Sequence, residues 1–375
     1  MKKTRVLFDN LFVARGGVEV MMYNLIAALP RDRYDVTVAA AHWDKHDPND
    51  RVPPGVRFIK RYHRRGSFKR YSPRWFLDVG WGRFYDALIA AYLSLLNFDI
   101  AIAAQEKQTM RRTDRLRARR KLAWVHTDYT TRLPQPKLSF PSPEAERACM
   151  ARFEKVICVS ETVKNGLIQT IGDPGNLVVC YNPIDAERIL RLSEEPCPLR
   201  RDPERPLLVS VGRLVAEKQY PLLLESCNIL SQTLDFELWL IGDGEERPLL
   251  ERYIAEHGLT QVKLLGTQPN PFPYLKQADL AVSSSRTEGY GLTVQEALIL
   301  GVPVAAVGCP GVRESLDPRF GVLTENSPEA LAAAIGQLLC EPELLRTYRD
   351  SIAHSFDRDA LYGPRLEMLV RQIEG

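Results

Sequence analysis

Two glutamates stand eight positions apart around a glycine-rich segment in the second half of the sequence. Glu288 and Glu296 enclose the residues Gly-Tyr-Gly-Leu, between an apolar strand-like run and an apolar helix-like run. A turn that leads from a strand into a helix leaves backbone N–H groups free to bind an anion. Ionised carboxylates, by contrast, only accept hydrogen bonds. The combination favours a ligand that carries both a diphosphate and hydroxyl groups, such as a nucleotide sugar.

Other polar residues and glycines follow further expected strands. Arg213 and Lys218 come after an expected strand over residues 207–211, and His126 follows one over 122–125. Because the carboxyl end of a strand in an open α/β sheet is where ligands bind, we expect these side chains at a cleft. The alternatives are a solvated pair of cations in a loop and a hydrogen-bonded structural histidine.

Glycines mark two more turns of interest. Gly16 and Gly17 separate the first expected strand from a helix that starts at residue 18, and a backbone without side chains lets a ligand approach closely. Gly242 belongs to a Gly-Asp-Gly turn after another expected strand. Both have structural alternatives, since a paired glycine turn is common and Gly242 can serve a tight turn without touching a ligand.

These segments carry a family resemblance. Glu288-x7-Glu296, with Gly-Tyr-Gly-Leu inside, resembles the signature of retaining glycosyltransferases of family 4, which have the GT-B fold. Residues 211–218 resemble the phosphate-binding segment of that family, and residues 239–244 and 16–19 also match it in order. The second half of the chain matches closely, and the first half matches mostly in layout.

The resemblance implies a role for each matching residue of the second half. Glu296 would bind the ribose hydroxyls, and Glu288 would accept hydrogen bonds from hydroxyls of the donor sugar. Backbone N–H groups of Gly291 and Leu292 would bind the diphosphate. Two further residues, Arg213 and Lys218, would stabilise the leaving phosphate in place of a metal. No metal site and no cofactor are therefore expected.

In the first half, the resemblance implies that His126 contacts the donor sugar or its phosphate. Asn182, in the segment Asn-Pro-Ile-Asp, would line the cleft between two domains. The implied reaction transfers a hexose with retention of configuration, and the nucleotide-sugar donor is expected to contain UDP rather than GDP. The implied acceptor is a saccharide or a saccharide linked to a polyprenyl diphosphate, as in bacterial polysaccharide assembly.

Strand-like and helix-like runs alternate through both halves, which predicts an α/β fold with parallel sheets covered on both faces. A charged, proline-rich stretch at 194–206 reads as a linker. We expect a Rossmann-like acceptor domain over 1–195 and a Rossmann-like nucleotide-sugar domain over 196–355. Residues 356–375 are expected to form a helix that returns to the first domain.

Charge is divided unevenly, although the net charge is only +3. Basic residues outnumber acidic ones in the first half, where 60–76 and 111–121 are rich in Arg and Lys, and aromatic rings interleave the first of these stretches. Such segments suit an anionic membrane surface or nucleic acid, and a solvated loop is the third interpretation. We prefer the membrane and expect no nucleic acid, because the resemblance implies lipid-linked acceptors.

Cysteine spacing and the length of the apolar runs indicate the cellular compartment. The chain has 7 cysteines, none in a CxxC pair, and its longest apolar run, 87–96, is far short of the roughly 20 residues that span a bilayer. We expect a cytoplasmic protein that can associate peripherally with the inner face of the membrane. The rivals to a transferase are a sugar-nucleotide epimerase of the same shape and, less favoured, a basic nucleic-acid-binding protein.

Overall fold

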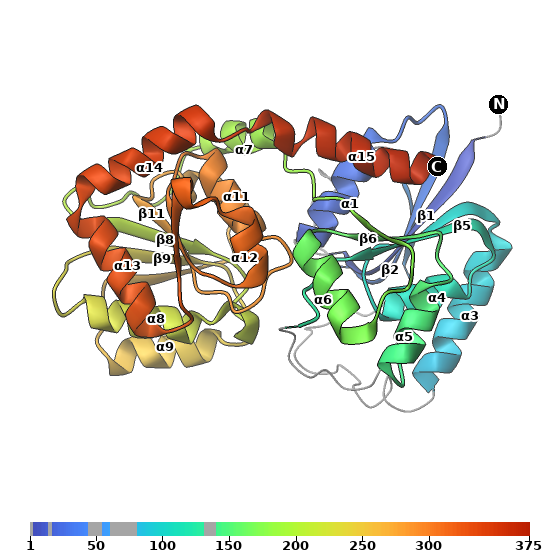
Figure 1. Ribbon diagram of the computed structural model, residues 1–375, viewed down its shortest axis with the longest axis horizontal. Coiled ribbons are helices and arrows are strands. Elements are labelled where there is room, and N and C mark those ends of the chain that lie inside the picture. The colour runs from blue at the N-terminus through green and yellow to red at the C-terminus, as the bar shows by residue number, and fades with distance from the viewer. Residues whose placement is uncertain (1–2, 14–16, 44–54, 61–80, 131–139) are drawn as a thin grey trace. The chain divides into compact units, whose positions relative to one another are not determined.

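The protein folds into two compact units, each built on its own sheet. The structure is a computed structural model that describes residues 3–13, 17–43, 55–60, 81–130 and 140–375. Unit 1 comprises Met1–Pro183 and Gly363–Gly375, and unit 2 comprises Ile184–Tyr362 (Figure 1). Every strand pairing in both sheets is parallel, which confirms the expected α/β class with two Rossmann-like sheets.

Unit 1 has a seven-stranded sheet in the order β3-β2-β1-β4-β5-β6-β7. Its strands are β1 (Thr4–Val13), β2 (Tyr34–Trp43), β3 (Arg57–Lys60), β4 (Phe98–Ala103), β5 (Ala118–Val125), β6 (Lys155–Cys158) and β7 (Leu177–Val179). The chain builds outward from β1 to β3 and then returns to place β4 on the other side of β1. The order of the strands therefore reverses between β1 and β4, which is where open α/β sheets bind ligands.

Alternation of buried side chains explains why helices cover both faces of this sheet. Val6 and Phe8 of β1 enter one apolar cluster and Leu7 enters another, and all three are at most 1% exposed. The covering helices are α1 (Gly17–Ala28), α3 (Trp81–Leu95), α4 (Gln108–Asp114), α5 (Pro143–Met150), α6 (Glu161–Ile171) and α15 (Gly363–Glu374). Figure 1 shows α15 beside α1, and its Leu369 and Ile373 join the larger cluster.

Unit 2 has a six-stranded sheet in the order β10-β9-β8-β11-β12-β13. Its strands are β8 (Leu207–Val211), β9 (Glu237–Ile241), β10 (Val262–Gly266), β11 (Leu280–Ser283), β12 (Val304–Val307) and β13 (Gly321–Thr324). Here the order reverses between β8 and β11. On β9 the same alternation occurs, with Leu238 and Leu240 in one cluster and Trp239 and Ile241 in another.

Eight α-helices belong to unit 2, and side chains cap two of them at the first turn. The eight are α7 (Ala186–Ser193), α8 (Tyr220–Leu230), α9 (Arg247–Glu256), α10 (Phe272–Leu275), α11 (Leu292–Ile299), α12 (Pro310–Ser315), α13 (Pro328–Cys340) and α14 (Pro342–Ser355). Ser327 caps α13 by accepting a hydrogen bond from the Ala330 backbone N–H at 3.1 Å. Its proline at the first helical position needs no hydrogen-bond partner.

The two units divide at 183/184 and at 362/363. From sequence we placed these divisions at 195/196 and 355/356. Between 184 and 195 the chain forms α7, which Asp185 caps through a 2.9 Å hydrogen bond from the Arg188 backbone N–H. Ile189 of α7 packs with Phe272 and Ile299 of unit 2, which is why the structure groups α7 with that unit.

Candidate active site

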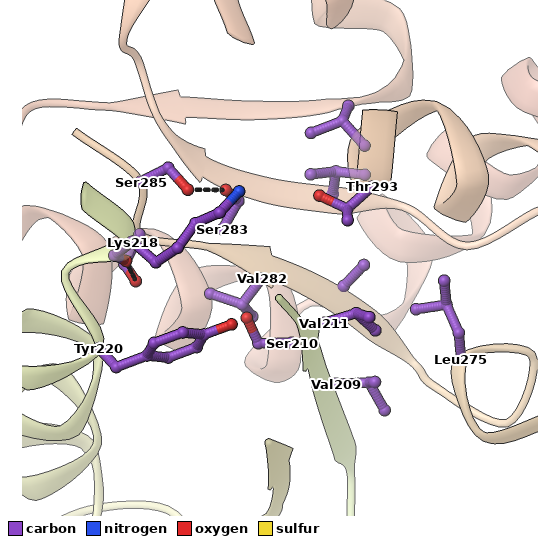
Figure 2. Close-up of a pocket in the computed structure, with 14 residues that line it drawn as sticks. Val209, Ser210, Val211, Lys218, Tyr220, Leu275, Val282, Ser283, Ser285 and Thr293 are labelled. Carbon is purple, nitrogen blue, oxygen red and sulfur yellow. Dashed lines mark hydrogen bonds between the residues drawn. The ribbon is translucent and has the colours of Figure 1, made fainter. Parts of the chain in front are cut away.

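The candidate site lies at the carboxyl ends of β8 and β11, where the strand order of unit 2 reverses. A hollow there is lined by Ser210 of β8, Lys218, Tyr220, Ser283 of β11 and Thr293 of α11, among other residues (Figure 2). Its floor is formed by apolar side chains of the two strands, and its polar groups come from the strand ends, from the loops that follow them and from the first residues of α8 and α11. Such a floor with a few convergent polar groups is typical of a small-molecule site.

Lys218 and Glu288 form an ion pair between these loops. The Lys218 ammonium donates to Glu288 Oε1 at 2.5 Å, and the two side chains are 20% and 15% exposed. The loops are tied together twice more, because Ser284 Oγ donates to the Lys218 carbonyl at 2.7 Å and the Arg286 backbone N–H donates to the Glu217 carbonyl at 2.9 Å. A cation and a carboxylate are thus held side by side at the carboxyl edge of the sheet.

The backbone around Lys218 is fixed by the residues that follow it. Gln219 has a left-handed conformation with φ of 48°, which is uncommon for a residue with a side chain, and α8 begins directly after it. Tyr220 is 2% exposed, and burial raises the pKa of its phenol, so the hydroxyl stays protonated. A Cβ at Gly212 would lie 2.8 Å from that hydroxyl, so glycine leaves the space that Tyr220 needs.

Glycines also position the Arg213 loop. Gly242 has φ of 142°, and a Cβ there would lie 1.8 Å from the Gly212 carbonyl oxygen, while one at Gly244 would lie 2.2 Å from the Leu214 carbonyl oxygen. A hydrogen bond also joins the Arg213 loop to the Gly242 turn, since the Leu214 N–H donates to the Asp243 carbonyl at 3.1 Å. Gly242 therefore has a packing role, and Gly244, which sequence reasoning placed in the same turn, packs against the Leu214 backbone.

Arg213 stands between these glycine contacts with its side chain exposed to solvent. Within the described residues its guanidinium forms neither an ion pair nor a hydrogen bond, whereas Arg201 and Arg205 of the same unit each pair with an aspartate. A cation held on a fixed backbone without a partner of its own is available to an anionic ligand.

The turn before α11 connects the Glu288 loop to the helix. Gly291 precedes α11 in a left-handed conformation, with φ of 67° and ψ of 52°, which glycine adopts at little cost. A Cβ at Gly311 would lie 2.1 Å from the Glu288 carbonyl oxygen, so glycine at 311 lets the Glu288 loop pack closely. Leu292 packs its side chain into the apolar cluster of α7, and Glu296 is half-buried on α11.

His126 lies in unit 1 at the carboxyl end of β5, held by residues that follow β4. Its Nε2 donates to the Ala104 carbonyl at 3.0 Å, since a carbonyl only accepts. Glu106 accepts from the His126 backbone N–H at 3.2 Å and from the Thr127 hydroxyl at 2.8 Å. Burial lowers the pKa of His126, against the opposing charge of Glu106, and favours a neutral imidazole. Glu106 was not among the residues that sequence reasoning selected.

A buried ion pair lies beside the reversal point of the sheet in unit 1. Arg112 of α4 donates from Nε and Nη2 to the two carboxylate oxygens of Asp9 on β1, both at 2.7 Å, and the Thr113 hydroxyl adds a bond at 3.2 Å. Asp9 is 0% and Arg112 1% exposed. This bidentate pair fixes α4 to the central strand.

The remaining residues of the predicted site also belong to unit 1. Gly17 is the first residue of α1, and Gly16 lies outside the described residues. Asn182 is 5% exposed, and its carbonyl accepts a hydrogen bond from Arg365 at 3.2 Å. The predicted site is thus divided, with His126, Gly17 and Asn182 in unit 1 and the other described members in unit 2.

The basic stretch 111–121 is not a uniform cationic surface. Arg112 is buried against Asp9, and Arg120 donates to both carboxylate oxygens of Glu154 at 2.7 and 2.8 Å. Arg115, Arg117 and Arg119 remain exposed. The expectation that the whole stretch faces a membrane is therefore wrong for Arg112, because the buried carboxylate of Asp9 neutralises it, and Arg120 is paired with the exposed Glu154. Almost all of the other stretch, 60–76, lies outside the described residues.

Neither a metal centre nor a membrane span is found in the part of the chain that the structure describes. No group of three or more His, Cys, Asp or Glu side chains there is arranged to hold a metal ion. No described helix combines the length and the hydropathy that crossing a membrane requires.

Both halves of the chain match models of glycosyltransferase families. Residues 193–353 match the model described as glycosyl transferases group 1, and residues 15–188 match the model described as glycosyltransferase family 4. Together the two matches extend over nearly all of both units. Each half of the chain therefore matches a glycosyltransferase model, and the two matches together indicate a glycosyltransferase with the GT-B fold, which supports the expected family at that level.

Curated relatives support the same assignment. The lipopolysaccharide core biosynthesis glycosyltransferase LpsE of Rhizobium meliloti is 28% identical over 173 residues, which cover 44% of this chain and 50% of LpsE. An N-acetylgalactosaminyltransferase of Campylobacter jejuni, whose name specifies a diphospho-undecaprenol-linked acceptor, is 28% identical over 200 residues, 50% of this chain and 53% of that one. The chain spans about half the length of the curated relatives it matches.

Solved structures show the fold over the full length. HepE of Anabaena, in complex with UDP and glucose, superposes with a TM-score of 0.75 at 18% identity and covers 99% of this chain and 100% of its own. TarM of S. aureus, in a complex that includes UDP, gives a TM-score of 0.74 at 15% identity and covers 100% of both chains. At these identities the likeness establishes the architecture.

Proposed function

We propose that the protein is a retaining glycosyltransferase that moves a hexose from a UDP-sugar to a saccharide acceptor without a metal. The observation that carries this proposal is the Lys218–Glu288 pair, held on two tied loops at the reversal point of unit 2 and next to the start of α11. It offers a cation for a diphosphate and a carboxylate for sugar hydroxyls. The solved complexes of HepE and TarM with UDP support a uridine nucleotide as donor.

Each residue takes a role that its position allows. Lys218 exchanges its contact with Glu288 for the diphosphate of the donor, and Glu288 then accepts hydrogen bonds from hydroxyls of the donor sugar. Arg213 adds a second cation. Because negative charge grows on the leaving phosphate as the glycosidic bond breaks, fixed cations there stabilise the transition state more than the bound donor.

Binding of the rest of the donor falls to α11 and to unit 1. Backbone N–H groups of Gly291 and Leu292 bind the diphosphate at the start of α11, and Glu296 binds the ribose hydroxyls. His126 contacts the donor sugar through its neutral imidazole. No side chain is assigned as a nucleophile, so the acceptor hydroxyl attacks from the face of the leaving group, and the leaving phosphate oxygen takes its proton.

The acceptor is a saccharide or a saccharide carried on a polyprenyl diphosphate. The names of LpsE and of the Campylobacter jejuni enzyme support bacterial surface polysaccharide or oligosaccharide assembly. We place the protein in the cytoplasm, at the inner face of the membrane where such carriers are used. Both of these relatives are named as transferases, which favours neither the epimerase nor the nucleic-acid-binding alternative.

Transfer is expected to survive removal of divalent metals. With UDP-hexose as donor, the rate of UDP release in the presence of an accepted saccharide should be the same before and after treatment with EDTA, since Arg213 and Lys218 supply the positive charge. Loss of the rate with EDTA and its recovery with Mg²⁺ or Mn²⁺ would mean that a metal performs this role. UDP release that does not depend on acceptor, with epimerised sugar as product, would instead promote the epimerase.

A further inference from the structure

One helix of unit 1 presents an apolar face to solvent. On α3, Leu88, Tyr92 and Leu95 are 52%, 51% and 77% exposed. Their spacing of four and three residues places them on one side of the helix. The opposite side is the buried one, because Ala90 and Leu93 pack into the cluster that contains Leu7 and Leu116.

This face is unusual for a solvated helix, whose outer side normally carries charged residues. From Ala87 to Asn97 the sequence contains no Lys, Arg, Asp or Glu. The other exposed large apolar side chains in the described part of the chain, Ile229, Leu249 and Met368, lie on three different helices. Single exposed apolar residues are ordinary, whereas three on one helical face indicate a contact surface.

Two exposed cations lie near the C-terminal end of α3. The Arg117 backbone N–H donates to Ser94 Oγ of α3 at 3.0 Å, which places the start of β5 against the last turn of the helix. Arg117 and Arg119 are exposed, and their side chains have no ion pair or hydrogen bond with any residue that the structure describes. Figure 1 shows α3 on the outside of unit 1, next to α4.

We propose that the exposed face of α3, together with Arg117 and Arg119, docks on an anionic lipid bilayer. Apolar side chains enter the region below the headgroups, Tyr92 lies at headgroup level, and the two arginines meet lipid phosphates. A symmetric contact between two copies fits less well, because it would bring the same arginines of both copies together. This inference rests on the membrane location proposed above, and it assigns the contact with the membrane to the exposed face of α3.

Co-sedimentation with lipid vesicles tests this surface without donor or acceptor, so its outcome is separate from that of the transfer reaction. The probes are vesicles of phosphatidylcholine alone and of an equal mixture of phosphatidylcholine and phosphatidylglycerol. One variant combines Leu88→Gln with Leu95→Gln, and another combines Arg117→Gln with Arg119→Gln. Leu249→Gln on α9 is the matched control, since Leu249 is 50% exposed and lies in unit 2.

The wild type and the Leu249 control should bind the mixed vesicles and not the neutral ones. Each double variant should bind at least ~10-fold more weakly, and added salt should release the wild type. Failure of the wild type to bind mixed vesicles, or equal binding by the Leu88/Leu95 variant, would overturn the proposal. So would a wild-type dimer that this variant dissociates, because the face would then be a contact between copies.

Discussion

Glu288→Gln is expected to lower the rate of sugar transfer by about 10- to 100-fold, with a smaller change in donor affinity. The substitution keeps the shape of the side chain but removes the charge that pairs with Lys218 at 2.5 Å and that would accept from donor hydroxyls. A hydrogen bond to a charged group contributes about 1.5–3 kcal/mol, which corresponds to this range of rates. Steady-state kcat and KM for the UDP-sugar measure the two effects separately.

The same unit offers a matched control for this variant. Glu237 on β9 pairs with Lys263 at 2.6 Å and is even more buried than Glu288, but this pair lies outside the candidate site. Glu237→Gln should reduce thermal stability and leave kcat unchanged. Equal losses of kcat in the two variants would show that Glu288 acts through the stability of unit 2 and has no part in transfer.

Arg112→Met is expected to lower the free energy of unfolding by about 3–5 kcal/mol, because it leaves the Asp9 carboxylate buried without its guanidinium. This is the largest stability effect that we expect from a single substitution in unit 1. Chemical denaturation, followed by a probe that reports on unit 1, measures it.

Two further variants test whether the loss of stability in Arg112→Met comes from the Asp9 charge that it leaves without its arginine. Arg152→Met removes an ion pair in which Arg152 Nη2 lies 2.6 Å from Asp114 Oδ2. Because the Arg152 side chain is 55% exposed, this variant should lower the free energy of unfolding by about 1 kcal/mol or less. Asp9→Leu combined with Arg112→Met removes both charges and should be more stable than Arg112→Met alone. If Arg112→Met costs no more than Arg152→Met, the buried pair does not stabilise α4 in the way inferred.

The fold class could be predicted from the sequence because the patterns that indicate it are local. Alternating apolar runs and turn residues are read within a window of about ten residues, and the parallel sheets follow from them. The glycines of the site were visible for the same reason. The sequence did not show which backbone each glycine faces, because Gly242 follows β9 and packs against Gly212, which follows β8.

Pairings between distant residues account for what sequence reasoning missed. Lys218 and Glu288 were both selected, but their ion pair spans 70 positions and depends on how two loops are tied. Arg112 was assigned to a basic surface, although it binds Asp9 across 103 positions in the interior. A run of arginines does not reveal which of its members a distant carboxylate neutralises.

Calorimetric titration of UDP tests the central claim most directly, namely that the Lys218–Glu288 site of unit 2 binds the donor diphosphate. The wild type should bind UDP at a single saturable site, and Lys218→Met should bind it at least ~10-fold more weakly, since a charge-assisted contact with phosphate is lost. Lys263→Met, which breaks the Lys263–Glu237 pair, should match the wild type. UDP binding that is unaffected by Lys218→Met, or no binding to the wild type, would contradict the assignment of the site.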